Sequence, residues 1–213
     1  MRPPESWQRA PFTVAIAIVT AASWLLVSLL GWSDQAALWG GFIPARVSQA
    51  GDAAALLPVL LTPLSATLLH AGLLHLGLNL VVHLWCGRSI EAILGSPALL
   101  VLYVVGAYSA AAAQYFAGPE TVDPMIGASG AISAVIGAYA ILFGRNRVRL
   151  GNAALATLVN ALWVAAAWIG LQLLIGYALG TMGTQLAVAA HIGGFLAGLV
   201  LAKPLLLWKW RKA

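Results

Sequence analysis

The sequence predicts an all-α, polytopic membrane protein, a bundle of six transmembrane helices with both termini in the cytoplasm. Hydrophobic residues make up 62% of the 213-residue chain and charged residues only 8%, whereas soluble domains carry roughly 25% charged residues. A helix needs about 20 apolar residues to cross the hydrocarbon core of a bilayer, and six apolar runs approach or exceed this length. The runs and short loops use nearly the whole chain, so we expect a single membrane domain over residues 1–213.

The predicted helices lie near residues 11–31, 64–86, 95–117, 125–143, 153–178 and 185–207. The first run is about 20 residues long, which is longer than the apolar region of a cleaved signal peptide, so we interpret it as a membrane span. The segment 32–62 between the first two helices is too apolar for a free linker. Proline and glycine interrupt it too often for it to cross the membrane, so we expect a partly embedded, interfacial loop on the outer side.

The basic residues give the orientation, because Lys and Arg accumulate in cytoplasmic loops. With both termini inside, only Arg46 of the 11 basic residues falls on the outer side. The ten inner ones are Arg2, Arg9, Arg88, Arg145, Arg147, Arg149, Lys203, Lys209, Arg211 and Lys212. The isoelectric point of about 9.8 therefore reflects membrane topology, and we expect no nucleic-acid partner.

Polar side chains within the predicted helices are few, and in a membrane such groups tend to be paired or functional. The second helix contains His70, His75, Asn79 and His83, the fourth Ser129 and Ser133, and the sixth His191. No carboxylate lies in any of the six runs, which disfavours a metal site, a proton relay and a Ser-His-Asp triad. We therefore expect no metal and no cofactor, and a Ser–His dyad remains as the candidate chemistry. Cys86 and His83 are interpreted as structural.

The topology places these side chains at similar depths. The second, fourth and sixth helices all run inward, and Ser129 and His191 each lie about one turn below the outer end. On the second helix, His75 and Asn79 are four residues apart and share a face, whereas His70 is expected to act from the helix start or the adjoining loop. Small residues on the fourth and sixth helices allow close packing, which would let Ser129 meet His191.

Three motifs resemble those of the rhomboid family of intramembrane serine proteases. They are Gly127-Ala128-Ser129-Gly130 in the fourth helix, His70-x4-His75-x3-Asn79 in the second, and Ala190-His191 followed by Gly194 and Gly198 in the sixth. The resemblance covers roughly residues 11–207. It implies a rhomboid-like bundle that cleaves transmembrane segments, with Ser129 as nucleophile and His191 as base.

The resemblance also implies a setting for the chemistry. His75, Asn79 and the backbone N–H of Ser129 would stabilise the oxyanion, with His70 in support. Substrates would be single-pass membrane proteins that reach the site laterally near the second and fifth helices. The compact chain suggests the plasma membrane of a prokaryote.

Two positions depart from the family pattern. The outer loop has Leu61 and Thr62 where family members often carry Trp-Arg, and Ser133 stands where some members have a tyrosine stacked on the catalytic histidine. Two other functions stay open: a non-catalytic rhomboid-like protein that binds membrane clients, and a transporter or channel. A transporter would be expected to place polar groups through the full depth of the bilayer, whereas here the informative ones gather at the outer end.

Overall fold

The computed structural model describes residues 7–48, 57–143, 152–180 and 187–211, and this part of the chain is helical throughout except for loops and one isolated bridge between Phe42 and Met125. The main helices are α1 (Pro11–Leu29), α5 (Leu73–Val82), α6 (Arg88–Leu94), α7 (Ser96–Ala117), α8 (Ser129–Phe143), α9 (Ala153–Gly180) and α10 (Val188–Trp210). Shorter elements are η1 (Trp7–Arg9), α2 (Ser33–Gly40), α3 (Ala45–Ser48), η2 (Val59–Leu61), α4 (Thr62–Ser65), η3 (Ala66–Leu68) and η4 (His83–Gly87). The all-helical fold is thus confirmed.

Three of the described helices, α1, α7 and α10, are long and apolar enough to cross a membrane. A fourth candidate is a pair of segments, Val59–Leu68 and Leu73–Leu94, bent by 90° at the break between them. The helix α8 is shorter, with 15 residues, and α9 contributes a shorter apolar stretch, Leu155–Gly170. The structure therefore supports a multi-pass membrane protein, and the count of six spans stays a prediction.

The second predicted helix differs most from expectation. Instead of one helix over 64–86, the chain bends after Leu68 and forms a rod from Leu73 to Leu94 through α5, η4 and α6. Leu69 and Gly72 have extended backbones, which interrupts the helix, and Gly95 ends the rod with a φ of +86°. His70 consequently lies in the loop before α5, one of the two places expected from the sequence.

The rod extends beyond the predicted run 64–86 and brings the carboxylate of Glu91 into the bundle. The expectation that no helix of the bundle carries a carboxylate is therefore wrong for the rod. Glu91 of α6 is 2% exposed. It accepts hydrogen bonds from the backbone N–H groups of Phe12 (2.9 Å) and Thr13 (2.7 Å), and from the hydroxyls of Thr13 (2.7 Å) and Ser96 (2.6 Å). The first N–H groups of a helix lack intrahelical acceptors and favour negative charge. Glu91 therefore caps α1, which begins without a side-chain cap of its own.

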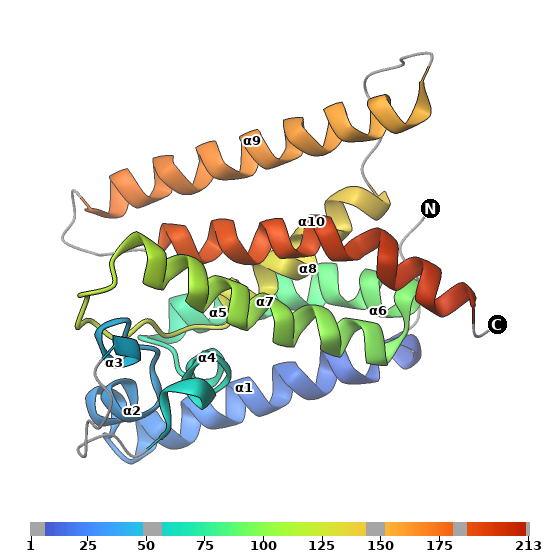
Figure 1. Ribbon diagram of the computed structural model, residues 1–213. Coiled ribbons are helices and arrows are strands. Elements are labelled where there is room, and N and C mark those ends of the chain that lie inside the picture. The colour runs from blue at the N-terminus through green and yellow to red at the C-terminus, as the bar shows by residue number, and fades with distance from the viewer. Residues whose placement is uncertain (1–6, 49–56, 144–151, 181–186, 212–213) are drawn as a thin grey trace.

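The helices α7, α8 and α10 form the centre of the bundle, with α1 and the rod against one side (Figure 1). Contact between α8 and α10 is backbone to backbone. A Cβ on Gly194 would collide with the carbonyl of Gly130, and one on Gly198 with the carbonyl of Ala134. Gly137 of α8 likewise faces the carbonyl of Phe195. These contacts fix the spacing of the two helices that carry Ser129 and His191.

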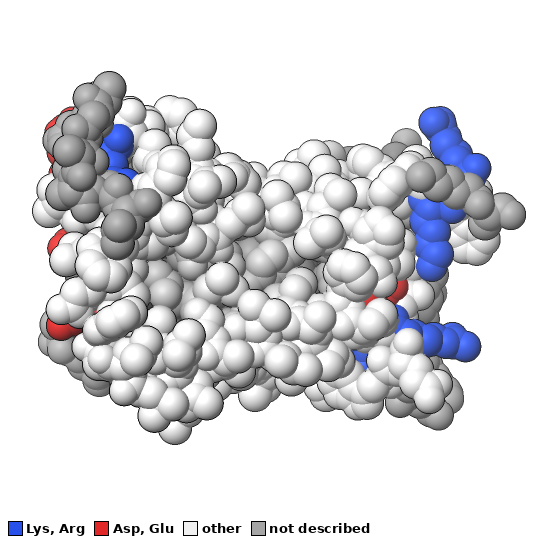
Figure 2. Space-filling view, turned by 90° about the horizontal axis from the view of Figure 1, so that it is seen from below, with Lys and Arg blue, Asp and Glu red and all other residues white. Residues whose placement is uncertain are grey.

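The helix α9 stands apart from the rest of the bundle and packs mainly along α10 (Figure 1). Its Trp168 ring stacks on Phe195 with centroids 5.4 Å apart. Among the residues that the structure describes, most Lys and Arg side chains gather at one end of the molecule and most Asp and Glu side chains at the other (Figure 2). The start of α1 and the end of α10 lie at the same end of the bundle (Figure 1).

Glu91 offers a test of how the bundle is held together. We expect Glu91→Ala to lower the free energy of unfolding by about 3 kcal/mol or more, because it leaves several buried donors without an acceptor. Ser96→Ala removes one bond to the same carboxylate and should cost only about 1 kcal/mol. Reversible unfolding in detergent micelles measures both. Equal stability of Glu91→Ala and the parent protein would contradict this role.

Candidate active site

Ser129 and His191 meet at the N-terminal ends of α8 and α10. The Oγ of Ser129 and the Nε2 of His191 lie 2.7 Å apart, although 62 residues separate them in sequence. His191 is 7% exposed and lies in the first turn of α10. A serine hydroxyl at this distance donates a hydrogen bond to a neutral imidazole nitrogen. The pair therefore has the geometry that a nucleophile and its general base require.

Gly127 shapes the backbone that leads into Ser129. Its φ is +114°, a conformation that residues with a side chain rarely adopt. A Cβ at this position would lie 2.7 Å from both Nε2 and Cε1 of His75. The Gly127 N–H donates to the carbonyl of Ala66 at 2.9 Å. The absence of a side chain thus lets the His75 imidazole approach the peptide just before the nucleophile.

His70 contacts the same backbone segment one residue further along the chain. Its Nε2 accepts a long hydrogen bond, 3.4 Å, from the N–H of Ala128. The His70 and His75 rings meet edge to face, with centroids 5.0 Å apart. The two histidines therefore contact each other and the chain at residues 127–128.

Asn79 lies one turn beyond His75 on α5 and is 7% exposed. Its Nδ2 donates to the carbonyl of His75 at 2.9 Å. A side-chain amide carries two N–H donors, so this bond engages one of them. The bond holds the Asn79 side chain along the same helix face as His75.

Ser133 occupies the position one turn after Ser129. Its hydroxyl donates to the carbonyl of Ser129 at 2.7 Å, within α8 itself. The Ser133 hydroxyl is therefore engaged with the backbone of its own helix, which is a common arrangement for serine in a helix.

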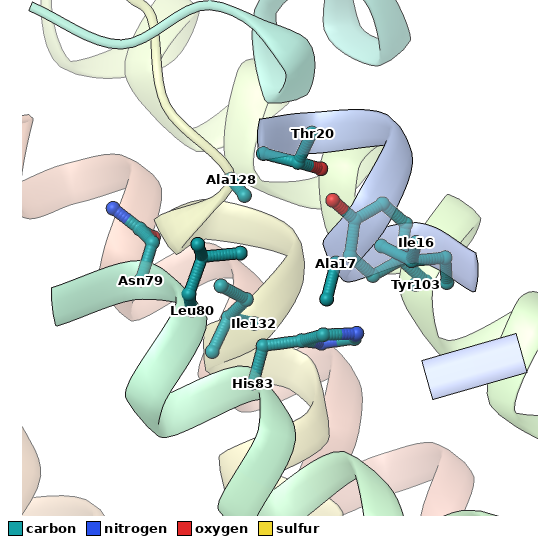
Figure 3. Close-up of a pocket in the computed structure, with 9 residues that line it drawn as sticks. All are labelled: Ile16, Ala17, Thr20, Asn79, Leu80, His83, Tyr103, Ala128 and Ile132. Atoms are coloured by element: carbon teal, nitrogen blue, oxygen red, sulfur yellow. The ribbon is translucent and has the colours of Figure 1, made fainter. Parts of the chain in front are cut away.

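His83 lies further along the rod than His75 and Asn79, beside a small cavity between α1, the rod, α7 and α8. Its Nε2 is 3.1 Å from the carbonyl of Thr13, and its ring meets the ring of Tyr103 edge to face. Figure 3 shows the His83 ring pointing toward Tyr103 and Ile16. These contacts connect the rod to α1, in agreement with a structural function for His83.

The loop between α1 and α5 also contacts the segment before Ser129, through hydrogen bonds that the sequence did not reveal. Phe42 and Met125 exchange two backbone hydrogen bonds, of 3.0 and 2.8 Å. The N–H of Ala45 donates to the carbonyl of Thr121 at 3.1 Å. Since only a few extended residues pair on each side, no alternating pattern marks these contacts in the sequence.

Gly127→Ala tests whether the backbone before Ser129 requires a glycine. We expect it to abolish labelling of Ser129 by a serine-reactive fluorophosphonate, because the substitution strains φ and displaces the His75 ring. Gly77→Ala is the matched control, since a Cβ at Gly77 meets no atom within 4 Å. Full labelling of Gly127→Ala would show that this conformation is not needed.

A comparison with protein families finds that the Rhomboid domain matches residues 59–208, which is more than half of the chain. A comparison with curated proteins finds no significant match. The matched region contains all three motifs, and the structure brings Ser129 to His191 and His70 to the N–H of Ala128. The chain therefore belongs to the rhomboid family of membrane proteins.

Proposed function

We propose that this protein is an intramembrane serine endopeptidase that cleaves transmembrane segments of membrane proteins with a Ser129–His191 dyad. The observation that carries the proposal is the 2.7 Å contact between Ser129 Oγ and His191 Nε2. A lone serine in a membrane helix is usually a packing residue. A serine hydroxyl held against an imidazole from another helix is instead the arrangement of an activated nucleophile.

The dyad supports hydrolysis in two stages. In the first, His191 Nε2 takes the proton of Ser129 as Oγ attacks the peptide carbonyl carbon. His191 then protonates the leaving amine, and the acyl group stays on Ser129 as an ester. In the second stage, His191 takes a proton from a water molecule that attacks the ester, and returns it to Oγ as the carboxylic acid leaves.

We assign the stabilisation of the oxyanion to the backbone N–H of Ser129, His75 and Asn79. The backbone N–H of Ser129 opens α8, where N–H groups lack intrahelical acceptors and the helix dipole favours negative charge. His75 stands beside Gly127, and Asn79 has a second amide hydrogen to offer. We assign His70 the supporting function of fixing the Ala128 peptide.

The proposed substrates are single-pass transmembrane proteins in the lipid bilayer. The outward face of the rod is strongly apolar, with exposed fractions of 60% or more for Leu73, Leu74, Leu78, Val81 and Trp85. This face suits contact with lipid or with a substrate helix, and access near α5 and α9 agrees with the separation of α9 from the bundle. A helical peptide bond is shielded, so the substrate must unwind locally before cleavage. We place the protein in a prokaryotic plasma membrane and expect it to need no cofactor.

Fluorophosphonate labelling tests the dyad directly. We expect the parent protein to be labelled, and Ser129→Ala and His191→Ala to lose labelling because nucleophile or base is missing. Ser133→Ala is the control, because this hydroxyl lies one turn away and bonds only its own helix backbone in the contacts described above. It should label like the parent.

Two results would decide against the protease. Labelling that persists in Ser129→Ala would remove the nucleophile from the proposal. A folded parent protein that is not labelled, yet still binds transmembrane clients, would identify a non-catalytic member of the family.

Asn79→Ala tests the oxyanion donors. We expect kcat for a transmembrane substrate to fall by about 10²–10³, because this donor acts mainly on charge that develops in the transition state. KM should change little for the same reason. The control is Ser89→Ala, which removes a comparable bond to the helix backbone, Ser89 Oγ to the Trp85 carbonyl, at the other end of the rod. A rise in KM without a fall in kcat would assign Asn79 to substrate binding instead.

A further inference from the structure

Arg46 is the one basic residue that the charge pattern assigns to the outer side, and the structure buries it. It lies in α3 with an exposed fraction of only 9%. Arginine is rarely buried without partners, because removing a guanidinium from water is costly. The contacts that the buried group makes therefore indicate why it is there.

The guanidinium of Arg46 joins two parts of the outer loop. Its Nη2 donates to the carbonyl oxygen of Leu57 at 2.7 Å, a contact between residues 11 positions apart. Its Nε and Nη1 are buried without a hydrogen-bond partner among the residues that the structure describes. A charged donor makes a stronger bond to a carbonyl than a neutral one does. This bond therefore connects α3 to the segment that leads into η2.

The positions where family members often carry Trp-Arg do not make this connection. Leu61 is 50% exposed. Thr62 is buried, but its Oγ1 donates to the carbonyl of Val59 within the same turn. Arg46 thus makes a polar link across the outer loop from a different place in the sequence, beside the bond from the Ser65 hydroxyl to the carbonyl of Gly40.

The part of the loop held by Arg46 contacts the segment that leads into Ser129. Ala45 bonds to Thr121, and Phe42 pairs with Met125 through two backbone bonds. Two residues beyond Met125, the N–H of Gly127 is held by the carbonyl of Ala66. A shift of residues 42–45 would therefore be passed to the backbone at residues 121–127, next to the nucleophile.

We propose that Arg46 is a positioning residue for the Ser129 site. By holding α3 against Leu57, it keeps residues 42–45 paired with 121–125 and so fixes the peptide groups that precede Ser129. The effect on cleavage rests on the proposed protease function. The effect on the backbone does not, and it can be measured by hydrogen exchange without any catalysis.

Hydrogen exchange at individual amides is the first test, with the full-length protein in lipid nanodiscs. Arg46→Met keeps the apolar stem and removes the donors. It should speed exchange at Phe42, Ala45, Met125 and Gly127 by about tenfold, the factor expected for one lost charge-assisted hydrogen bond. Arg46→Lys keeps a charged donor and should recover part of the protection. Exchange in α7 and α10 should stay unchanged.

Ser48→Ala is the matched control. Ser48 lies on the same short helix, and its hydroxyl bonds only to the carbonyl of Ala45 in the described contacts, at 3.3 Å. We expect it to exchange and cleave like the parent protein.

Steady-state cleavage of a transmembrane substrate is the second test. Arg46→Met should lower kcat by about tenfold and leave KM within about a factor of two, because the displaced peptide groups act in the transition state. Arg46→Lys should restore part of kcat.

Unchanged exchange at the four amides of Arg46→Met would overturn the inference, as would an equal increase throughout α7 and α10. An altered KM with kcat preserved would overturn it too. If the parent protein lacks activity, the proposed function fails, while the exchange pattern still decides whether Arg46 holds this segment.

Discussion

The contact between the backbones of α8 and α10 is the constraint on which the site depends. At Gly194 and Gly198 the carbonyl oxygens of α8 occupy the space that a side chain would fill. Between membrane helices such close packing is a main source of attraction, because lipid is as apolar as the side chains it would replace. The approach brings Ser129 and His191, 62 residues apart, to a hydrogen bond of 2.7 Å. A larger side chain at Gly194 or Gly198 would push α8 and α10 apart. Ser129 Oγ and His191 Nε2 would then lie beyond the distance at which a proton can pass between them.

Two polar groups inside this apolar protein, Glu91 and His83, are matched to backbone groups of a neighbouring helix. Glu91 accepts from the first turn of α1, and His83 contacts the carbonyl of Thr13 in the same turn. A polar group without such a partner is costly in an apolar environment. These contacts therefore specify where α1 lies against the rod, whereas the apolar contacts around them fit many positions.

The site is completed by backbone segments outside the long helices. Gly127, in a conformation with positive φ, is held by Ala66 on one side and faces His75 on the other. The loop between α1 and α5 pairs with the chain just before Gly127, at Phe42 and Met125. The rod supplies His75 and Asn79, and the loop before it supplies His70. The chemistry we propose thus combines one rigid helix pair with peptide groups whose positions depend on the loops around them.

The sequence by itself determined the membrane class, the helical fold and the family, because apolar runs and motif spacings are local properties of the chain. The helix ends at residues 96–117 agree closely with the predicted run. The sequence also placed Ser129 and His191 at similar depth, but depth says nothing about rotation, and only packing decided that the two side chains face each other. The bend before α5, the reach of the rod to Glu91 and the burial of Arg46 were likewise decided by tertiary structure. Glu91 is held by α1 and Arg46 by Leu57 through hydrogen bonds that leave no periodic pattern in the sequence.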